Sequence, residues 1–386
     1  MKKEPFLYAI SFLVDGSFAV VGLCVPLLAM GVGATYDDLG GIRATQSIAY
    51  SLGCFLLARW SDRIGYRRLM TFSTGAMALL FLGFLAVDRV WHLFLLACLI
   101  GPMLAAFWPC LQAWLGQGKA RRQLLSALGG FNVAWSLGFV VGPTLGGTLY
   151  AMDPHHVFVL ASAVIAVVFA GLLLGRFADG DAAPPDAPEH ETLAAARRFL
   201  PVAWVANFAT FYAVGTVRSL FPKLATDLGI APDMLGYLMS LIGLGQLCTF
   251  VVLAHTDRWQ FRLAPLAAIQ AAAAVALALF AATGALALFA LGMLACGLLI
   301  GTTFTSSVFY SLHAHAAGGQ RAGIHEGIVG TGVFLGPLVG GFIAEHVGAR
   351  APYHVAILIL ICAFLVEAGL LWNSRPGLAT ERRQTP

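Results

Sequence analysis

Charged residues are scarce in this chain, and that scarcity sets its class. Only 11 % of its 386 residues are Asp, Glu, Lys or Arg, whereas 59 % are hydrophobic. Soluble domains carry about 25 % charged residues, so the composition indicates an integral membrane protein. The formal net charge of +4 points to no particular partner, because in such a chain the placement of basic residues matters more than their sum. We expect no nucleic-acid partner.

The chain also lacks the patterns of disulfide frameworks and metal sites. All seven cysteines fall inside apolar segments, and none is paired in a loop or at metal-ligand spacing. We therefore expect no structural disulfide. His313, His315 and His325 flank a glycine-rich loop, but no carboxylate or cysteine set completes a metal site there. We expect these histidines to be solvated.

Signatures of catalysis are missing as well. No nucleophile–base set, glycine-rich phosphate loop or metal-ligand pattern appears in register. We therefore expect a protein that is not an enzyme and that holds no cofactor and no metal.

We expect the start of the chain to be a transmembrane helix and not a signal peptide. The first apolar run extends from about Phe6 to Met30, which is too long for a signal-peptide core, and no cleavage site follows it. A spanning helix needs about 20 mainly apolar residues. On that criterion the sequence predicts an all-α membrane protein with twelve transmembrane helices, at 6–30, 39–58, 69–87, 92–115, 124–150, 156–176, 199–221, 234–254, 263–282, 286–312, 323–346 and 353–373.

A polar, proline-rich stretch separates the sixth predicted helix from the seventh. We assign residues 1–177 to an N-terminal six-helix half, 178–196 to a cytoplasmic linker, 197–375 to a C-terminal six-helix half and 376–386 to a cytoplasmic tail.

The loops between the predicted helices are short on both sides of the membrane and leave little surface for a stable soluble partner. We expect a monomer.

The basic residues predict the orientation. With both termini in the cytoplasm, eighteen of the 23 lysines and arginines lie on the cytoplasmic side, which satisfies the positive-inside rule. The others, outside or near the outer face, are Arg43, Arg89, Arg218, Lys223 and Arg350. We place the protein in the bacterial inner membrane as a multi-pass protein of the cell membrane.

One glycine-rich stretch occurs twice. Gly138-Phe-Val-Val-Gly142-Pro143-Thr-Leu-Gly146-Gly147 recurs 194 residues later as Gly332-Val-Phe-Leu-Gly336-Pro337-Leu-Val-Gly340-Gly341. Other pairs keep nearly the same offset, since Pro26 and Gly40 correspond to Pro222 and Gly236 at 196. A constant offset indicates a duplicated chain, and hence two pseudo-symmetric halves. Glycines spaced four apart let membrane helices approach closely, and the proline bends the helix.

The loop after the second predicted helix carries a second motif, Ala58-Arg-Trp-Ser-Asp62-Arg63-Ile-Gly65-Tyr-Arg67-Arg68. It resembles the loop signature of the major facilitator superfamily, G-x-x-x-D-[RK]-x-G-x-[RK]-[RK], with Ala58 in place of the first glycine. The resemblance implies a transporter whose two six-helix halves rock around a central cavity. We expect Asp62 to act as a conformational latch. We expect the arginines to bind carbonyl ends and anionic headgroups, or only to set the topology.

The stretch from Gly138 to Gly147 resembles the signature of the drug:proton antiporter branch of that superfamily. In that branch the fourth helix usually carries an arginine, whose position falls on Cys98 here. We assign a gating or conformational role to the residues of both motifs: Asp62, Arg63, Gly65, Arg67, Arg68, Gly138, Gly142, Pro143, Gly146, Gly147, Gly336 and Pro337.

Candidate cavity residues follow from helix periodicity. Tyr8, Ser11, Asp15 and Phe18 share one face of the first predicted helix. Their repeat counterparts in the seventh are Trp204, Asn207, Phe211 and Val214, followed on the same face by Arg218. Further substrate-cavity candidates, each of which could instead serve ordinary helix packing, are Gln46, Tyr50, Trp108, Gln112, Asn132, Trp135, Thr303, Ser307 and Tyr310.

Asp15 is the leading candidate for proton coupling. It lies about nine residues, or roughly 13 Å, inside the first predicted helix and hence near the bilayer midplane, where a charged carboxylate costs about 2.5–3.5 kcal/mol. The alternative is an aspartate that is capped or paired for structural reasons. Glu326 is a second candidate, for which we favour a first-turn carboxylate stabilised by the helix dipole. Glu367, near the inner end of the last helix, is similarly ambiguous.

Arg43 and Arg218 lie near the outer ends of their helices. Either could hold an anionic substrate group bidentately. We favour pairing with Asp37, Asp38 or Asp227 in an outer gate, or snorkelling.

These observations predict a secondary active transporter of a small-molecule substrate, working by alternating access. We expect proton-coupled efflux of small amphipathic organic molecules, because aromatic residues line the expected cavity. One alternative is a proton-coupled uptake symporter for an organic acid, a sugar or another nutrient. An alternative of another class is a membrane sensor that does not transport.

Overall fold

The fold is described by a computed structural model of residues 3–119, 121–175, 190–313 and 318–373. These residues form twelve α-helices and one short 3₁₀ turn, with no strand among them. In chain order the elements are α1 (Lys3–Gly31), α2 (Tyr36–Ile64), α3 (Tyr66–Gly83), η1 (Phe84–Ala86), α4 (Val90–Gly116), α5 (Arg121–Met152), α6 (Pro154–Leu174), α7 (His190–Asp227), α8 (Pro232–Ala254), α9 (Leu263–Ala282), α10 (Leu286–His313), α11 (Gly318–His346) and α12 (Ala351–Asn373).

Long apolar stretches make these helices, since a backbone surrounded by lipid must satisfy its hydrogen bonds internally. Among the described residues, eleven of the helices are long and apolar enough to cross a membrane. The exception is α2, which carries Asp37, Asp38 and Arg43 as well as Gln46. It packs between α4 and α11, and Arg43 and Gln46 line a cavity inside the bundle, whereas Asp37 and Asp38 lie in its first turn and are partly exposed.

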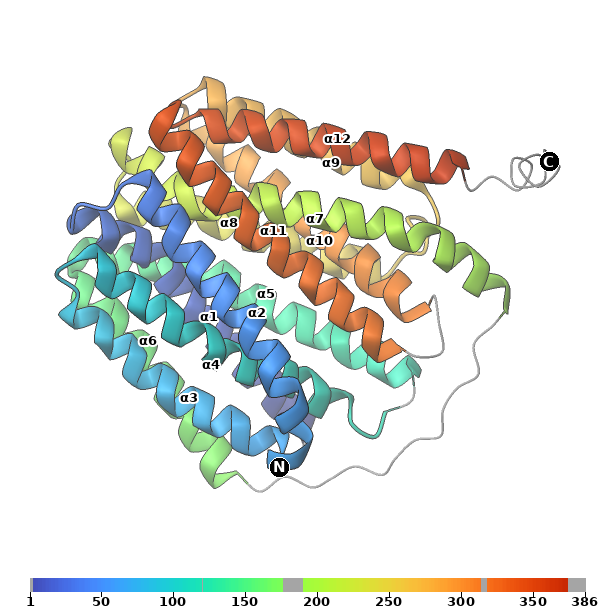
Figure 1. Ribbon diagram of the computed structural model, residues 1–386, viewed down its shortest axis with the longest axis horizontal. Helices are drawn as coiled ribbons and strands as arrows, with labels where there is room; N and C mark the ends of the chain where they lie inside the picture. Colours follow the sequence, from blue (N-terminus) through green and yellow to red (C-terminus); the bar gives the residue numbers. More distant parts are fainter. Residues whose placement is uncertain (1–2, 120, 176–189, 314–317, 374–386) are drawn as a thin grey trace.

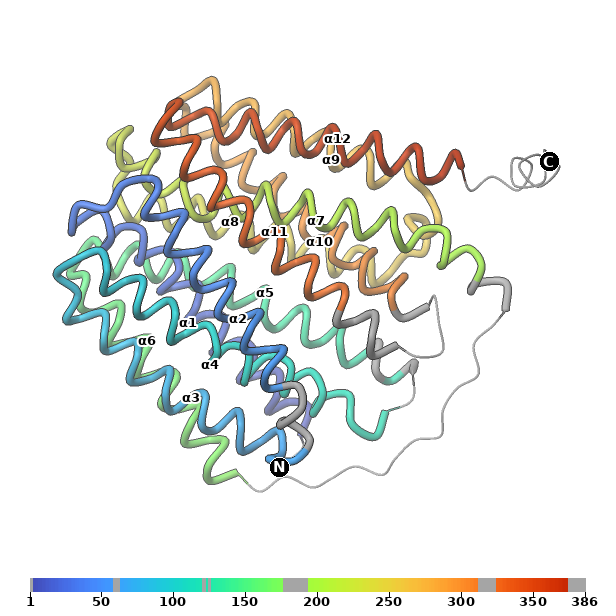
Figure 2. The backbone as a smooth tube through the Cα atoms, viewed as in Figure 1, coloured from blue at the N-terminus to red at the C-terminus, as the bar shows by residue number. Residues whose placement is uncertain are grey.

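The helices form two bundles that lie side by side (Figure 1). In this view α1 to α6 occupy the lower part and α7 to α12 the upper part. Two helix pairs, α2 with α11 and α5 with α8, make the main contacts between the bundles. In Figure 2, α3 and α6 lie along one outer edge, and α9 and α12 lie along the other. This arrangement of two six-helix halves agrees with the predicted fold class.

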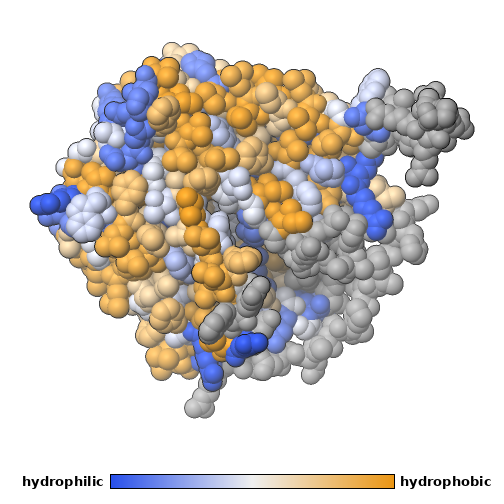
Figure 3. All heavy atoms as spheres, in the orientation of Figure 1, coloured by the Kyte–Doolittle hydropathy of each residue, from blue (hydrophilic) through white to orange (hydrophobic). Residues whose placement is uncertain are grey.

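The two ends of the bundle are distinct. We call the end that holds the start of α1 and the end of α12, which extends from the bottom centre to the right of Figure 1, the termini end, and the opposite one the far end. Hydrophobic side chains dominate the visible face between these ends (Figure 3). Exposed examples include Phe55, Leu79 and Val167. A monomeric soluble protein rarely exposes so continuous an apolar surface, which is what contact with lipid tails requires.

Several helix boundaries differ from the predicted ones. Helix α2 continues six residues past residue 58, and α11 begins five residues before residue 323. Helix α7 already begins at His190, so the predicted linker 178–196 is too long at its C-terminal side; residues 176–189 and the predicted tail lie outside the described residues. Hydropathy detects only the apolar part of a helix, whereas the backbone stays helical in the polar turns beyond it.

Candidate functional site

The glycines of the repeated motif contact two different neighbours: a helix of their own half and a helix of the other half. Gly138, Gly142 and Gly146 face α1: a Cβ added at Gly138 would lie 2.6 Å from the backbone nitrogen of Gly16, and one at Gly142 would lie 2.6 Å from the Gly16 carbonyl oxygen. In the second half Gly332 and Gly336 approach α7 in the same way. These glycines join helices within one half, because only a residue without a side chain permits the approach.

The last glycine of each motif instead contacts the other half. A Cβ added at Gly147 would lie 3.0 Å from the Cα of Gly236 in α8, and one at Gly341 would lie 3.1 Å from the Cα of Gly40 in α2. The partner glycines correspond to each other in the repeat. The Pro143 and Pro337 carbonyl groups lie directly against Gly236 and Gly40. Two equivalent backbone contacts therefore close the far end between the halves.

Polar groups reinforce this closure. The Tyr36 hydroxyl donates to Asp227 over 3.0 Å, and the Tyr36 amide donates to Glu345 over 2.9 Å. Lys223 pairs with Asp227 at 3.4 Å. The predicted pairing of Arg43 or Arg218 with Asp37, Asp38 or Asp227 is wrong, because Asp227 is engaged in this way and the other two contact His346 and Thr35.

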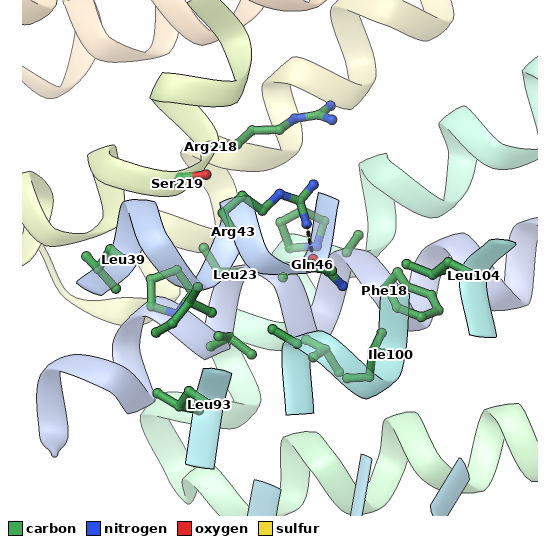
Figure 4. A pocket seen from close by; sticks show the side chains of 18 of the residues that line it. Phe18, Leu23, Leu39, Arg43, Gln46, Leu93, Ile100, Leu104, Arg218 and Ser219 are labelled. Carbon is green, nitrogen blue, oxygen red and sulfur yellow. Dashed lines mark hydrogen bonds between the residues drawn. The ribbon is translucent and has the colours of Figure 1, made fainter. Parts of the chain in front are cut away.

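A cavity of about 250 Å³ lies beneath the closed far end. That volume equals about eight water molecules at ~30 Å³ each, enough for a small organic molecule. Its walls are mainly aliphatic and aromatic, with Phe18, Phe84, Trp108 and Phe139 among them. Most lining residues belong to α1, α2 and α4 (Figure 4). Only Arg218, Ser219 and Met239, of the described residues that line it, come from the second half.

Three charged side chains line this cavity: Asp15, Arg43 and Arg218. The Asp15 side chain is buried, with 8 % of the residue exposed. Within the described part of the chain, Asp15 makes no side-chain hydrogen bond and no ion pair. It lies close enough to Arg218 for an electrostatic attraction without forming a salt bridge. The alternative of a structurally capped or paired Asp15 therefore finds no partner among the described residues.

Aromatic side chains lie between the halves on the termini side of the cavity. The Trp135 ring lies 5.8 Å from Phe139, 5.9 Å from Phe250 and 5.9 Å from Phe304, measured between ring centroids. Phe211 lies 6.3 Å from Phe304. These rings come from α5, α7, α8 and α10. This aromatic layer therefore joins both halves at mid-depth.

Five of the predicted cavity and coupling residues line the cavity, namely Asp15, Phe18, Gln46, Trp108 and Arg218. The others do not: Tyr8, Ser11, Tyr50, Gln112, Asn132, Trp135, Trp204, Asn207, Phe211, Thr303, Ser307, Tyr310 and Glu326. Several of these residues are buried, but burial toward a neighbouring helix and burial toward a cavity give the same sequence pattern.

Local contacts account for several of these residues. The Ser11 and Thr303 hydroxyls donate to carbonyl groups one turn earlier in their own helices. The Trp204 indole donates to Ser311 over 3.2 Å, and the Tyr310 hydroxyl accepts from the Phe261 amide over 2.7 Å. The amide group of Asn207 is buried without a hydrogen-bond partner among the described residues. Trp135 donates to Asn132 over 3.2 Å.

His325 is buried and Glu326 is half-buried, which the sequence did not suggest. His325 is 4 % exposed, and its ring shares a hydrogen bond of 2.7 Å with Ser307, so the expectation of a solvated histidine is wrong; the side chains of His313 and His315 lie outside the described residues. Glu326 is not in the first turn of its helix, because α11 begins at Gly318. It contacts Gln112 by a hydrogen bond and lies near Tyr50. Glu326 therefore links α11 to α4 across the two halves.

Glu367 is fully buried between α12 and α9. Its carboxyl oxygen accepts a hydrogen bond of 2.7 Å from the Gln270 amide. The second oxygen of Glu367 and the amide oxygen of Gln270 have no partner among the described residues. If the second oxygen of Glu367 carried a proton, it could donate a hydrogen bond to the amide oxygen of Gln270. The contact therefore fits a pair formed by a neutral carboxylic acid and an amide within the second half.

The loop motif joins helices of the first half at the termini end. The Arg67 guanidinium donates to the carbonyl groups of Leu172 and Leu173 over 2.7 and 3.0 Å. These carbonyls end α6, where a cation is favourable. Gly65 precedes α3 with a φ of 92°, which glycine adopts readily. Arg63 and Arg68 are exposed, and the Asp62 side chain lies outside the described residues.

Sequence reasoning missed several lining residues. Phe139 lies within the glycine motif, whose spacing drew attention to its glycines only, and Ser219 follows Arg218 in α7. Phe84 belongs to the 3₁₀ turn η1 at the end of α3. Polar periodicity could have identified Ser219, but no sequence signal distinguishes the aromatic residues of a cavity from those of a helix interface.

Two similar helical bundles with a cavity between them, closed at one end, define a helical membrane transporter, as distinct from an enzyme. The family model described as Major Facilitator Superfamily matches residues 7–323 and 203–386. The chain therefore belongs to the Major Facilitator Superfamily, and it is a multi-pass membrane protein.

Similar proteins support this assignment. The uncharacterized MFS-type transporter YfkF of Bacillus subtilis is 23 % identical over 374 residues, which cover 89 % of this chain and 90 % of that protein. The tetracycline resistance protein, class D, of Salmonella ordonez is 27 % identical over 169 residues, covering 39 % and 43 % of the two chains. The crystal structure of a bacterial homologue of the human lysosomal transporter Spinster, inward-facing and unoccupied, superposes with a TM-score of 0.74 at 15 % identity, over 96 % and 97 % of the chains.

Proposed function

We propose that this protein is a proton-coupled secondary transporter of small amphipathic organic molecules, with Asp15 as the coupling group. The observation that carries the proposal is the state of Asp15: a buried carboxyl group in the wall of the cavity, with no side-chain hydrogen bond and no ion pair among the described residues. A structural carboxylate in a membrane protein is normally paired. An unpaired one beside a cavity can take up a proton from it and release the proton to it.

The cavity walls support the substrate class. Aromatic and aliphatic side chains cover most of the surface, and a few polar groups interrupt it. Binding sites for small organic molecules have this composition, since apolar walls supply affinity and isolated polar groups fix orientation. A substrate with an apolar body and a polar group matches these walls.

The different contacts at the two ends of the cavity support alternating access. The backbone contacts of Gly147 and Gly341 close the far end, while the aromatic layer around Trp135 lies on the termini side of the cavity. We infer that the halves rock apart at one end at a time. Protonation of Asp15 changes the charge of the cavity, and therefore changes the relative stability of the two open states.

Export is the direction that the glycine motif supports, because that motif resembles the drug:proton antiporter signature and a tetracycline resistance protein is among the similar sequences. Uptake of an organic acid by proton symport is the second candidate, and Arg43 and Arg218 in the cavity favour it. The similar proteins described above do not support the alternative of a non-transporting sensor. We place both termini in the cytoplasm of a bacterium, and we propose that the protein acts as a monomer.

The test uses purified protein in liposomes that contain a pH-sensitive dye, with an imposed proton gradient. Lipophilic cations, neutral drugs and organic acids are added in turn to the wild type and to Asp15→Asn. We expect substrate-dependent proton flux in the wild type and none in Asp15→Asn. The control is Asp88→Asn, an exposed aspartate in the loop before α4, which should keep the wild-type flux.

Equal proton flux in the wild type and in Asp15→Asn would remove Asp15 from the coupling role. Substrate movement without proton flux in both would refute proton coupling itself. Opposite movement of substrate and protons identifies antiport, and parallel movement identifies symport.

A further inference from the structure

We propose that Arg43 and Arg218 together form a subsite for the anionic group of the substrate, so that the protein transports small organic anions that carry a carboxylate or a phosphoryl group. The inference rests on the proposed transport function, and it names the substrate class of the same cavity.

Arg43 is held in position by its own helix. Its Nη1 donates to the Gln46 side-chain oxygen over 2.6 Å, and both residues line the cavity. Figure 4 shows the two side chains joined in this way, with Arg43 lying below Arg218. Since one amide oxygen satisfies only one of the five guanidinium donors, most of the hydrogen-bonding capacity of Arg43 remains available to a ligand.

Arg218 reaches the same cavity from the other half. Its guanidinium carbon lies 4.4 Å from the centre of the Phe139 ring, a contact that supports the cation across the interface between α7 and α5. Its Nη2 is buried and has no hydrogen-bond acceptor among the described residues. A buried guanidinium nitrogen without an acceptor is costly, and the oxygen of an anion in the cavity would remove that cost.

The charge balance of the cavity is positive. Arg43 and Arg218 repel each other, and the one carboxylate among the described lining residues is Asp15, which attracts Arg218 without pairing with it. Two cations and one anion leave a formal charge of +1 when Asp15 is ionised and +2 when it is protonated. Buried charges in a membrane protein are normally compensated. The substrate is therefore the missing anion.

Two guanidinium groups also fit the geometry of an oxyanion. Each offers parallel N–H donors that match the two oxygens of a carboxylate or of a phosphoryl group. A lipophilic cation would face net repulsion in this cavity, and a neutral molecule would leave the donors unmatched. The aromatic walls then hold the apolar body of the anion.

The charge of Asp15 sets the sign of the coupling for such a substrate. Ionised Asp15 partly offsets Arg218 and repels an incoming anion, whereas protonated Asp15 does neither. The anion and the proton therefore strengthen each other's binding, so for such a substrate the subsite favours proton symport, the second candidate above, over export by antiport. The charged groups involved are Asp15 on α1, Arg43 on α2 and Arg218 on α7; Cys296 on α10 also faces Arg218.

Binding to the purified protein tests the subsite. The protein is kept in a neutral detergent free of anionic lipid, which excludes lipid headgroups as the bound anion. The probes are benzoate and phenyl phosphate, compared with benzamide and benzylamine, which share the ring but are neutral and cationic. Dissociation constants are obtained from the shift of the thermal unfolding midpoint with probe concentration.

We expect at least one of the anions to bind the wild type about tenfold or more tightly than benzamide, the range of a charge-assisted hydrogen bond. Arg43→Gln and Arg218→Gln should each lose that preference, and Arg218→Lys should keep part of it. Asp15→Asn should tighten anion binding by at least about threefold, because it removes the competing negative charge. Arg89→Gln, which changes an exposed arginine outside the cavity, is the matched control and should behave as the wild type.

Three results would overturn the subsite: neither anion binds more tightly than benzamide, the preference survives in both Arg→Gln variants, or Asp15→Asn weakens anion binding. The wild-type comparison decides the first point even if a variant fails to fold. No proton gradient is present, so the measurement is independent of coupling. If the wild type shows no preference for anions but does show substrate-dependent proton flux, the subsite is refuted and the proposed function stands. If it prefers anions but shows no such flux, proton coupling is refuted and the subsite stands.

Discussion

Replacement of Gly147 by alanine should open the far end. The added Cβ would lie 3.0 Å from the Cα of Gly236 and would overlap the Pro232 carbonyl oxygen. Both neighbours are backbone atoms, so no side-chain rotation can make room. Overpacking of this kind costs about 1–3 kcal/mol. Because the contact joins the two halves, that cost falls on the state with a closed far end and is relieved when the halves separate there.

The expected size follows from the two-state equilibrium. A destabilisation of about 1–3 kcal/mol raises the ratio of far-open to far-closed molecules by about 5- to 160-fold, with RT near 0.59 kcal/mol. Gly341→Ala should act similarly, since Gly341 makes the equivalent contact with Gly40. The matched control is Gly129→Ala in the same helix α5, where an added Cβ meets nothing within 4 Å.

Cysteine labelling measures this shift. The seven native cysteines are replaced, and Ser219→Cys places one thiol in the cavity wall. A membrane-impermeant maleimide is applied to intact cells. With both termini in the cytoplasm, as proposed, the far end faces the outside, so the reagent can enter the cavity only through that end. We expect faster labelling of Ser219→Cys when Gly147→Ala is added and an unchanged rate with Gly129→Ala. An unchanged rate in folded Gly147→Ala protein, or an equal increase in the control, would refute the assignment of Gly147 to the closure of the far end.

Two further predictions concern helix ends. Arg67→Gln should lower the apparent melting temperature in detergent, because it removes two charge-assisted hydrogen bonds to the last carbonyls of α6. These bonds are worth about 1 kcal/mol at a partly exposed site. The control, Arg68→Gln at the exposed neighbouring position, should leave the melting temperature unchanged. Asp153 accepts from the backbone amide of His155 over 2.8 Å at the start of α6, and hydrogen bonds from that amide and from the His155 ring lower the pKa of Asp153. The ionised Asp153 carboxylate therefore stabilises the folded state above the pKa that this group has in the unfolded chain, about 3.9, and this contribution is lost as the pH falls through the lower pKa of the folded state. Asp153→Ala should therefore be less stable than the wild type at neutral pH, and the difference should shrink in acid; a difference independent of pH would contradict this account.

The sequence predicted the fold well, because the fold depends on signals that are local and strong. Apolar runs located all twelve helices, and the offset between Gly142 and Gly336 indicated the duplication that appears as two bundles. The helix ends were less predictable. The start of α7 at His190 lies in a polar stretch, where hydropathy carries no information about whether the backbone remains helical.

The site was only partly predictable. Asp15, Arg218 and Trp108 were identified because polar or aromatic residues on one helix face stand out from an apolar chain. Tyr310 and Trp204 fit the same pattern but serve contacts within the second half. The pairing of Tyr36 with Asp227, which leaves Arg43 and Arg218 without carboxylate partners among the described residues, depends on how α2 and α7 meet. That meeting is set by tertiary packing, which a single sequence does not reveal.

The unequal division of the cavity between the halves has a consequence for release. Nearly all of its described wall belongs to the first half, and the second half contributes one charge, that of Arg218. A rigid rotation of one half against the other therefore leaves the apolar walls intact and withdraws a single cation from them. If the proposed subsite holds an anion, opening the far end would weaken the binding of that anion while its apolar pocket stays assembled. The two halves are similar in fold but unequal in the cavity, where the second half mainly positions one positive charge, that of Arg218.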